Sequence, residues 1–382
     1  MKKIKVGIAG VGFIGPAHLE ELRRIPNIEV VSIQNRGLEK VKEKALALGI
    51  ERYYDNYDEF ITKDELDCVH ICTPNALHYE MVKKAFAQGI HVVCEKPLAT
   101  TVTEAKDLLK IANEKELVHA VHFNIRYYPM VRQMKMMREK GELGTIYSII
   151  GSYLQDWLFY ETDYNWRLES AQSGASRAVA DIGSHLIDLL EYISGLRIVA
   201  VLADFNTIHS TRKKPLKPIE TYSGKILQPE DYQDVPIDTE DYASILLRFD
   251  NGNKGVVTVS QVSAGRKNRL SLEISGSSKT FQWDSENPNS LWIGEREEPN
   301  RQLLRDPSLF HKEAATLVSF PGGHNEGFPD TSKQLFKEVY QAIRVGKQPD
   351  HPSYPTFEDG LRELIICDRI IESQREEKWI RI

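Results

Sequence analysis

The chain has 382 residues, a length at which one hydrophobic core usually gives way to two domains. Its hydrophobic share of 41% and charged share of 27% fit an ordinary globular protein. The formal net charge of −6 argues against a nucleic-acid partner, because phosphate binding usually needs a basic face.

The N-terminus and the cysteines bear on location and on metal binding. The segment MKKIKVGIAGVGFIG joins lysines to an apolar stretch, but glycines interrupt it and no small-residue cleavage site follows. No apolar run reaches the ~20 residues that span a bilayer. We therefore expect a cytoplasmic protein without a membrane segment. Cys68, Cys72, Cys94 and Cys367 form no CxxC pair and have no zinc spacing, so we expect buried thiols and no metal.

The first 123 residues alternate strand and helix patterns. The predicted strands are short and apolar: Ile4–Ala9, Val30–Ile33, Cys68–Cys72, His91–Cys94 and Val118–Phe123. The predicted helices are His18–Ile25, Leu38–Leu48, Ala76–Ala87 and Thr103–Glu114. This alternation is typical of a doubly wound parallel sheet buried on both faces. We assign residues 1–124 to a first domain built on this sheet.

The pattern then changes to consecutive strands separated by turn signals. The predicted strands are Ile146–Leu154, Val199–Asn206, Tyr242–Phe249, Gly255–Val262, Leu270–Ile274 and Thr280–Trp283. The predicted helices are Asp181–Ile193, Thr331–Val345 and Phe357–Gln374, and Thr211–Asp238 reads as an extended surface excursion. We assign residues 125–382 to a second α/β domain with a mostly antiparallel sheet.

A glycine-rich motif, GVGFIG, follows the first predicted strand. It consists of Gly10, Gly12 and Gly15, with Phe13 and Ile14 between the last two glycines. Between a strand and a helix, such glycines permit a tight turn and let backbone N–H groups approach a pyrophosphate. The motif predicts an NAD or NADP cofactor; a glycine-rich turn without a nucleotide is the alternative.

The end of the second predicted strand bears on the choice between NAD and NADP. NAD-binding proteins place a carboxylate there, which accepts hydrogen bonds from the ribose. This chain has Asn35 followed by Arg36. An Asn–Arg pair does not repel a 2′-phosphate as a carboxylate does, so the pair favours NADP. A solvated surface arginine is the alternative.

Lys96 directly follows the predicted strand His91–Cys94, in the segment Glu95-Lys96-Pro97. Ligands of doubly wound sheets lie beyond the carboxyl ends of the strands. We therefore expect the ammonium group near a nicotinamide, hydrogen-bonded to the substrate oxygen. An exposed lysine at a strand end is the alternative.

Asp181 and His185 lie four residues apart in a predicted helix and so share one face. A carboxylate one turn from an imidazole orients the ring and raises its basicity, as a general base requires. Helix capping by Asp181 with core packing of His185 is one alternative, and metal binding by both is another.

Loops and aromatic residues from position 124 onward supply candidates for contacts with substrate hydroxyls. The loop Pro321–Gly327 carries His324 and Asn325, and a surface turn is the alternative reading. The candidates for hydroxyl contacts, of which the aromatic ones could equally be packing, are Asn124, Tyr127, Trp157, Tyr160, Tyr164, His324 and Asn325.

Taken together, these motifs resemble the family of glucose–fructose oxidoreductase, inositol 2-dehydrogenase and MocA, nearly from end to end. The markers are Gly10–Gly15, Thr73-Pro74-Asn75, His78, Glu95-Lys96-Pro97, Arg126, Pro129, Trp166-Arg167, Asp181–His185 and Thr239-Glu240-Asp241. The resemblance implies a Rossmann domain and an α/β domain whose large open sheet commonly forms a dimer or tetramer interface. Many relatives carry Asp in place of Asn35, so a preference for NAD is not implied.

The resemblance also implies roles for single residues. Lys96 matches the lysine that contacts the reacting hydroxyl, often beside a cis-proline, and His185 matches the catalytic acid/base with Asp181 as its companion. We expect the cofactor contacts to include Thr73, Asn75, His78, Glu95, Lys96, Trp166 and Arg167, of which Asn75 and Glu95 match positions on the nicotinamide side. We expect the substrate contacts to include Lys96, Asn124, Arg126, Tyr160, Asp181, His185 and His324.

From these observations we expect a dehydrogenase that transfers hydride between NAD(P) and a secondary hydroxyl of a sugar, a sugar derivative or an inositol. His185 would remove the hydroxyl proton while Lys96 stabilises the oxyanion. An NAD-dependent glycosidase that uses transient oxidation and a dinucleotide-binding sensor are the alternatives. We expect a small sugar or polyol and further copies of the chain, as a homodimer or homotetramer, to be the partners, with no nucleic acid and no membrane.

Overall fold

The computed structural model describes residues 3–216 and 229–382, and contacts within the chain divide it into two compact units. Unit 1 comprises Met1–Asn124 and Phe328–Leu364, and unit 2 comprises Ile125–Gly327 and Ile365–Ile382. This division differs from the predicted one, because residues 328–364 group with the N-terminal part. The physical reason is packing: helix α10 (Phe328–Val345) lies against α1, and Phe357 belongs to the core of unit 1.

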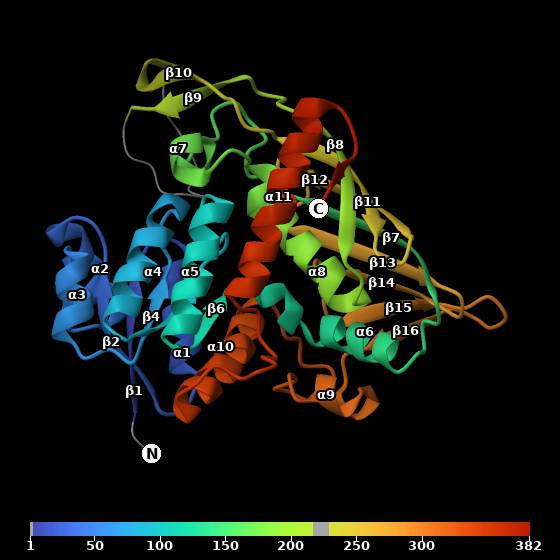
Figure 1. The fold of residues 1–382 in the computed structure, drawn as a ribbon, viewed down its shortest axis with the longest axis horizontal. Coiled ribbons are helices and arrows are strands. Elements are labelled where there is room, and N and C mark those ends of the chain that lie inside the picture. The colour runs from blue at the N-terminus through green and yellow to red at the C-terminus, as the bar shows by residue number, and fades with distance from the viewer. Residues whose placement is uncertain (1–2, 217–228) are drawn as a thin grey trace. The chain divides into compact units, whose positions relative to one another are not determined.

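A six-stranded parallel sheet forms the centre of unit 1, with the strand order β3-β2-β1-β4-β5-β6 (Figure 1). Its strands are β1 (Ile4–Ala9), β2 (Ile28–Gln34), β3 (Arg52–Tyr54), β4 (Cys68–Ile71), β5 (His91–Cys94) and β6 (His119–Val121). All pairings between neighbours are parallel. This confirms the predicted doubly wound sheet, in the order that is typical of dinucleotide-binding folds.

Helices follow the strands of unit 1 in the predicted alternation. They are α1 (Ile14–Arg23), α2 (Leu38–Leu48), α3 (Tyr57–Lys63), α4 (His78–Ala87), α5 (Val102–Glu114), α10 and the first part of α11 (Phe357–Glu376). The sequence explains several of their ends. Thr101 and Glu104 form a capping box at the start of α5, and Gly49 ends α2 in the left-handed conformation. The short β3 and α3 were not among the predicted elements.

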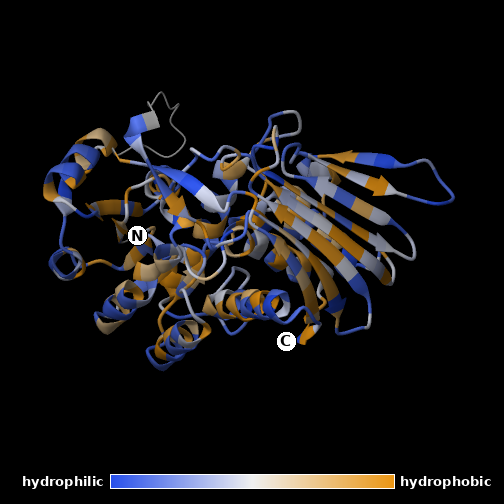
Figure 2. Ribbon diagram, turned by 90° about the horizontal axis from the view of Figure 1, so that it is seen from above, coloured by the Kyte–Doolittle hydropathy of each residue, from blue (hydrophilic) through white to orange (hydrophobic). Residues whose placement is uncertain are grey.

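A nine-stranded sheet forms the framework of unit 2, in the order β16-β15-β14-β13-β7-β12-β11-β8-β17. Its strands are β7 (Ile146–Leu154), β8 (Ile198–Asn206), β11 (Tyr242–Phe249), β12 (Lys254–Ser260), β13 (Arg269–Gly276), β14 (Thr280–Asp284), β15 (Ser290–Gly294), β16 (Arg301–Leu304) and β17 (Ile380–Arg381). Strands β7 and β12 run parallel, and the other neighbours run antiparallel. Apolar and polar residues alternate along the strands (Figure 2), so only one face of the sheet is apolar throughout.

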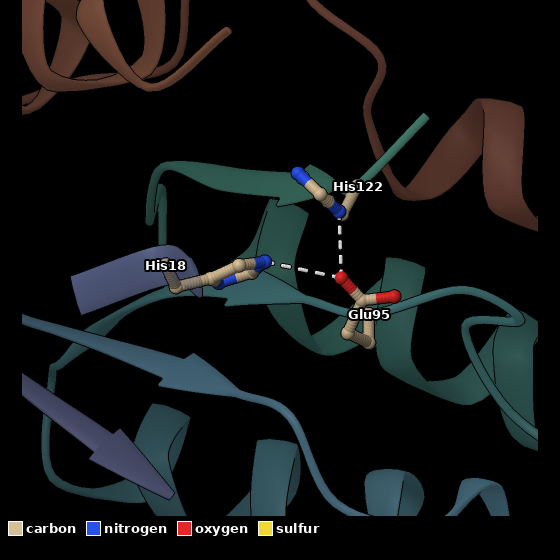
Figure 3. Close-up of side chains that lie close together, drawn as sticks. All are labelled: His18, Glu95 and His122. Atoms are coloured by element: carbon tan, nitrogen blue, oxygen red, sulfur yellow. Dashed lines mark hydrogen bonds and ion pairs between the residues drawn. The ribbon is translucent and has the colours of Figure 1, made fainter. Parts of the chain in front are cut away.

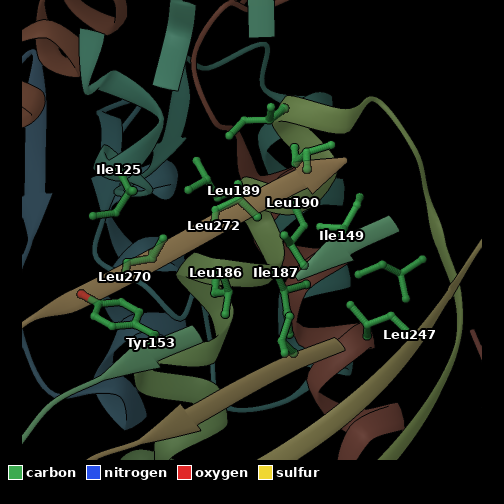
Figure 4. Close-up of a cluster of buried hydrophobic side chains, with 14 of the residues drawn as sticks. Ile125, Ile149, Tyr153, Leu186, Ile187, Leu189, Leu190, Leu247, Leu270 and Leu272 are labelled. Atoms are coloured by element: carbon green, nitrogen blue, oxygen red, sulfur yellow. The ribbon is translucent and has the colours of Figure 1, made fainter. Parts of the chain in front are cut away.

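Helix α8 (Ser184–Ser194) covers the apolar face of this sheet (Figure 4). Its leucines and isoleucines, including Leu186 and Leu190, belong to one buried core with side chains of β7, β11 and β13. A Cβ atom on Gly151 of β7 would lie 2.9 Å from a methyl group of Leu186, so the glycine permits the close approach of the helix. Helix α8, which carries His185, is therefore fixed by the core of unit 2.

Shorter elements complete unit 2. They are α6 (Pro129–Glu139), α7 (Ser170–Ser173), α9 (Lys312–Ala315), the 3₁₀ turns Asn124–Tyr127, Trp166–Leu168, Pro229–Asp231 and Pro307–Leu309, a π-helical turn Val179–Gly183, and the pair β9 (Thr211–Pro215) and β10 (Tyr232–Pro236). Strands β9 and β10 lie within the predicted surface excursion, whose residues 217–228 are outside the described part of the chain. All four cysteines are buried thiols, as predicted. Among the described residues, no helix combines the length and the apolar composition needed to cross a membrane.

Candidate active site

The GVGFIG motif forms the turn between β1 and α1. Gly10 has a φ of +89°, and a Cβ atom there would lie 2.5 Å from the carbonyl oxygen of Cys72. A Cβ atom on Gly15 would lie 2.1 Å from the carbonyl oxygen of Gly10, so α1 begins directly against the turn. Gly12 is different, because within the described chain a Cβ atom there would have no neighbour within 4 Å. The backbone at Gly12 is open to a diphosphate, as the predicted dinucleotide motif requires.

The first turn of α1 provides the positive end of a helix. The helix begins at Ile14, earlier than the predicted His18, and its N-cap residue is Phe13. A phenylalanine has no polar side-chain atom with which to cap the first N–H groups, and the ring of Phe13 is exposed. An anion bound at the turn would therefore meet backbone N–H donors and a favourable helix dipole.

Asn35 and Arg36 lie beside this turn, at the end of β2. The N–H group of Val11 donates to Oδ1 of Asn35 at 3.5 Å, and the N–H group of Gly10 donates to the carbonyl oxygen of Gln34 at 2.8 Å. The side chain of Arg36 is exposed. An amide and a guanidinium thus stand where a ribose carboxylate partner would stand in an NAD-binding protein.

The loops after β4 and β5 are joined by His78. Its Nδ1 atom lies 2.8 Å from the carbonyl oxygen of Pro97, and its Nε2 atom lies 2.9 Å from the carbonyl oxygen of Thr73. Burial is the main cause that lowers the pKa of His78. Both ring nitrogens therefore contact the protein's own backbone, and His78 holds the loop of Thr73 and Asn75 against the loop of Lys96. Lys96 is half-buried, and the Lys96–Pro97 peptide bond is cis, as expected.

Glu95 lies at the carboxyl end of β5, and two histidines contact one of its oxygens (Figure 3). Oε1 lies 2.6 Å from Nδ1 of His122 and 3.1 Å from Nε2 of His18. Burial by itself would raise the pKa of Glu95, but the charge and hydrogen bond of His122 and the bond from His18 hold that pKa well below its usual range. Glu95 is therefore a buried carboxylate that remains ionised.

Asp181 and His185 lie at a junction between two kinds of helix. Asp181 belongs to the π-helical turn Val179–Gly183, and His185 belongs to the first turn of α8. The structure corrects the uniform helix that the spacing predicts, and such π-turns are frequent at functional sites. Oδ2 of Asp181 accepts a hydrogen bond of 2.9 Å from Nε2 of Gln261. Both Asp181 and His185 are half-buried.

Trp166 and Arg167 form the 3₁₀ turn that faces Asp181. Nε of Arg167 lies 3.4 Å from Oδ1 of Asp181, and the guanidinium lies 4.6 Å from the ring centroid of Trp166. Asn165 caps this turn by accepting the N–H group of Arg167 at 2.8 Å. The predicted cofactor positions Trp166 and Arg167 thus belong to the same cluster as Asp181.

The segment before Asp181 is held by Glu240. Its carboxylate accepts the N–H groups of Arg177 and Val179, at 3.0 and 2.8 Å, and the hydroxyl of Ser176 at 2.7 Å. All these groups are buried. Glu240 thereby caps the start of the turn that carries Asp181.

Asp241 lies beside Glu240 and binds two guanidinium groups, those of Arg177 and Arg212. All three side chains are 0% exposed. Burial would raise the pKa of Asp241, but Arg177 together with Arg212 and the N–H group of His209 lowers it below the usual value. Through its ion pair with Arg177, Asp241 therefore also holds the segment that precedes the π-helical turn.

The predicted substrate-binding residues have different environments. Nδ2 of Asn124 donates to Oγ1 of Thr331 at 2.8 Å, and Asn124 is buried. Nε of Arg126 donates to Oδ2 of Asp188 at 2.8 Å. The structure therefore engages both residues in internal contacts, within unit 1 for Asn124 and within unit 2 for Arg126.

Other predicted hydroxyl contacts lie on loops of unit 2 or in its interior. Tyr160 is 65% exposed, and His324 and Asn325 are exposed on their loop. Tyr127 is buried, Nε1 of Trp157 donates to Oε1 of Gln155 at 2.6 Å, and the hydroxyl of Tyr164 donates to Glu169 at 3.3 Å. Exposure thus separates Tyr160, His324 and Asn325 from the aromatic residues that pack or bond internally.

The loop that carries His324 is built around a buried arginine that the sequence did not single out. Nη1 of Arg305 donates to Glu326 at 2.9 Å and to the carbonyl oxygen of Phe320 at 2.8 Å. Its Nη2 atom donates to the carbonyl oxygens of Pro321 and His324. The loop therefore presents His324 and Asn325 from a fixed backbone.

Sequence reasoning also missed the histidines around Glu95, and it named Glu240 and Asp241 only as family markers. The signal for His18 is its spacing from the glycine motif, and the signal for His122 is its place at a strand end. Neither signal reveals that both rings meet one carboxylate. Lys96 belongs to unit 1 while Asp181 and His185 belong to unit 2, so their convergence remains a prediction.

Two family models match the chain. Residues 4–123 match the oxidoreductase family with an NAD-binding Rossmann fold, and residues 131–282 match the GFO/IDH/MocA C-terminal domain. The two matches cover the glycine turn, Lys96, Asp181, His185 and Glu240.

Curated relatives align with nearly the whole chain. Levoglucosan dehydrogenase of Pseudarthrobacter phenanthrenivorans is 28% identical over 401 aligned positions, which cover 100% of this chain and 99% of that protein. Glucose-6-phosphate 3-dehydrogenase of Bacillus subtilis is 27% identical, with 96% of this chain and 95% of that protein covered.

Solved structures are similar over the same extent. A levoglucosan dehydrogenase in complex with NADH and levoglucosan has a TM-score of 0.88 and is 29% identical, with 100% of this chain and 99% of that chain covered. An oxidoreductase domain protein from Kribbella flavida has a TM-score of 0.89 and is also 29% identical, with full coverage of both chains. With both family models matched and these relatives aligned throughout, the chain belongs to the GFO/IDH/MocA family of oxidoreductases with an NAD-binding Rossmann fold.

Proposed function

We propose that this protein is an NAD(P)-dependent dehydrogenase that acts on a secondary hydroxyl of a sugar, a sugar derivative or an inositol. The observation that carries the proposal is the turn at Gly12, where the backbone is open and α1 begins without a side-chain cap. Support for the substrate class comes from the aligned relatives, which are named for levoglucosan and glucose 6-phosphate.

The backbone of Gly10–Gly15 would hold the cofactor diphosphate, and a bound nicotinamide supplies the acceptor or donor of the hydride. We assign the ammonium group of Lys96 to the substrate oxygen, where it stabilises negative charge as the hydroxyl loses its proton. We assign His185 as the base that takes this proton and returns it in the reverse reaction. Asp181, held by Gln261 and Arg167, borders the substrate and supports the positive charge that His185 gains.

Asn35 and Arg36 carry the proposal that NADP is preferred to NAD. Neither side chain repels a 2′-phosphate, and the exposed guanidinium of Arg36 is suited to pair with it. We propose His324 and Asn325, on the loop held by Arg305, and the exposed Tyr160 as candidates for contacts with the remaining substrate hydroxyls.

A second copy of the chain is the proposed macromolecular partner, as a homodimer or homotetramer. Support comes from a row across the nine-stranded sheet, in which the register aligns Leu246 with Val256, Ile150, Glu273, Gln282 and Trp292. Leu246, Ile150 and Trp292 are 45%, 50% and 38% exposed. These three exposed apolar side chains are suited to burial between sheets. Light scattering of the purified protein measures the assembly directly.

The proposed activity is tested by following absorbance at 340 nm with a panel of sugars, anhydrosugars, sugar phosphates and inositols. NAD⁺ and NADP⁺ are assayed separately, and binding of each cofactor is measured by calorimetry. We expect turnover with at least one member of the panel and tighter binding of NADP⁺. A protein that binds neither cofactor contradicts the proposal, and a protein that binds but turns over no panel member contradicts the substrate class.

A further inference from the structure

The histidines that contact Glu95 belong to a longer buried chain of hydrogen bonds within unit 1. Nδ1 of His18 lies 2.9 Å from Nδ1 of His70, and Nε2 of His70 lies 2.8 Å from the hydroxyl of Tyr340. His18, His70, His122 and Tyr340 are all at most 3% exposed. The chain therefore joins α1, β4 and α10 to the carboxyl end of β5, where Lys96 follows.

Electrostatics assigns a direction to every bond in this chain. Glu95 is ionised, so it accepts the Nε2 proton of His18. Burial, with the nearby charge of His122, lowers the pKa of His18 to about 4, so His18 is neutral and its Nδ1 atom is an acceptor. His70 must then donate its Nδ1 proton to His18, and its Nε2 atom accepts the hydroxyl proton of Tyr340. All of these protons point towards the carboxylate.

Further bonds strengthen the same polarity. Nδ1 of His122 donates to Glu95, and its Nε2 atom lies 3.0 Å from the hydroxyl of Ser332 on α10. The thiol of Cys72 also lies beside this chain, 3.3 Å from Nδ1 of His18, and burial raises the pKa of Cys72 well above its usual value, so the thiol brings no negative charge. The side chain of Phe336 packs against the rings of His18, His70 and His122. One buried anion thus organises polar groups from α1, α10 and the three strands β4 to β6.

His18, Glu95 and His122 together are also a donor set that binds zinc in other proteins. The distances favour hydrogen bonds instead. Two ligands of one tetrahedral zinc ion lie about 3.3 Å apart, given Zn–N and Zn–O bonds of about 2.0–2.1 Å. Oε1 of Glu95 and Nδ1 of His122 lie 2.6 Å apart, which is a short, charge-assisted hydrogen bond.

We propose that Glu95 is a positioning residue, which through His18 and His122 fixes the cofactor-binding helix α1 against the strand end that carries Lys96. The inference rests on the proposed function, because Glu95 acts only by positioning the glycine turn, which would bind the cofactor, and Lys96, which would contact the substrate. His18 lies one helical turn after Gly15, so its bond to Glu95 sets the distance between the start of α1 and β5. His122 fixes the same carboxylate from β6, and the loop of Lys96 therefore begins from a rigid point.

The test compares Glu95→Gln with Glu80→Gln, which neutralises an exposed carboxylate on α4 of the same unit. The Glu95→Gln side chain has nearly the same volume but cannot accept two N–H donors on a charged oxygen. Dissociation constants of NADPH and NADH are measured by fluorescence on folded protein, well below each variant's Tm. We expect binding of the preferred cofactor to weaken about ten- to hundredfold in Glu95→Gln, because hydrogen bonds to a charged group are lost. We expect binding to be unchanged in Glu80→Gln.

A pair of variants at His122 separates hydrogen bonding from packing. His122→Asn keeps an N–H donor close to the position of Nδ1, whereas His122→Leu removes it. We expect the Asn variant to retain cofactor affinity within about threefold and the Leu variant to lose it as Glu95→Gln does. The pH profile of kcat should shift in the Leu variant and not in the Asn variant, because only the former displaces the loop of Lys96.

Two results would overturn the inference, and a third would contradict the proposed function instead. Normal cofactor affinity in a folded Glu95→Gln protein with a lowered Tm would reduce Glu95 to a structural residue and overturn the proposal. Stoichiometric zinc in the purified wild type, measured by atomic emission, would overturn the hydrogen-bonded arrangement. Failure of the wild type to bind either cofactor would instead contradict the proposed function, so the two failures are distinguishable.

Discussion

The carboxylate of Glu240 accepts the N–H group of Val179 at 2.8 Å, two residues before Asp181. The two residues lie 61 positions apart in the sequence, and both are buried. It anchors the π-helical turn whose next residues include Asp181 and, one turn later, His185. A residue outside the proposed reacting groups therefore controls where they lie.

Replacing Glu240 with alanine should disturb this turn more than the overall fold. The three groups that donate to Glu240 would each lose a charged acceptor, and one such bond is worth about 1.5–3 kcal/mol of unfolding free energy. We expect a lower Tm and a fall in kcat of at least tenfold, because Asp181 and His185 lose their fixed backbone. Glu298→Ala, at an exposed position of the same unit, serves as the control. A variant with a lowered Tm but full kcat would show that the turn holds its shape without Glu240.

Removing the proposed reacting groups should separate chemistry from binding. We expect Lys96→Ala and His185→Ala each to lower kcat by about 10²–10⁴, the usual contribution of an acid–base group. Tm should stay close to that of the wild type and the protein should still bind the cofactor, since neither side chain forms the glycine turn. Lys106→Ala, at an exposed position of α5, is the matched control. Activity within a few-fold of wild type in either variant would refute the assigned role.

Two glycines of the same motif should respond differently to alanine. Gly12→Ala adds a methyl group in open space, so we expect an unchanged Tm and cofactor binding that is weaker by at least about tenfold. Gly10→Ala combines a φ of +89° with a clash against the carbonyl oxygen of Cys72, so we expect a clear loss of stability. Calorimetry of unfolding and of cofactor binding measures both. Equal effects of the two substitutions on Tm would contradict the open space beside the backbone of Gly12.

Cofactor choice should depend on the end of β2. Asn35→Asp introduces a carboxylate that repels a 2′-phosphate and accepts hydrogen bonds from a ribose. We expect the ratio of kcat/KM for NADP⁺ to that for NAD⁺ to fall by at least about tenfold, with Arg36→Ala changing it in the same direction. Lys40→Ala, exposed on α2, is the control. A ratio that does not move in either variant would assign the preference to other residues.

Acid should destabilise unit 1 through its buried histidines. Burial is the main cause that lowers the pKa of His119 to about 4, and Asp359 opposes the shift. Between about pH 6.5 and pH 4 the unfolded chain binds a proton at this residue and the folded chain does not. Stability is therefore complete above pH 6.5 and falls as the pH decreases towards 4, by about 3 kcal/mol for such a residue. His18 contributes in the same direction, with His70, Cys72, Glu95 and His122 around it.

His119→Asn tests the sign of this effect. Nδ1 of His119 accepts the N–H group of Phe357 at 3.1 Å, and the amide oxygen of asparagine can take its place without titrating. We expect the variant to lose less stability than the wild type between pH 6.5 and 4, measured by urea unfolding at each pH. An exposed histidine, His324, replaced with asparagine should leave the slope unchanged. A steeper slope in His119→Asn would show that the sign is wrong.

Local patterns in the sequence were sufficient to predict the alternating elements of unit 1, the glycine turn and the strand end at Lys96. Each depends on residues near one another in the chain: buried β-branched runs, glycines at fixed spacing and a helix that follows. Weak or short patterns were missed, such as the three-residue β3 and the first turn of α1. The segment Phe328–Leu364 was assigned to the second half because the sequence pattern does not show which sheet a helix packs against.

The tertiary structure alone decided which distant polar groups share a partner. Periodicity reports which face of an element is apolar, but a buried carboxylate is stable only where donors from other elements reach it. Glu95 with His18 and His122, Glu240 with Val179, and Arg305 around the His324 loop are of this kind. The sequence by itself determined the fold class, the family and the reactive groups that are available. The long-range packing determined which of those side chains are held in place and which ones hold them.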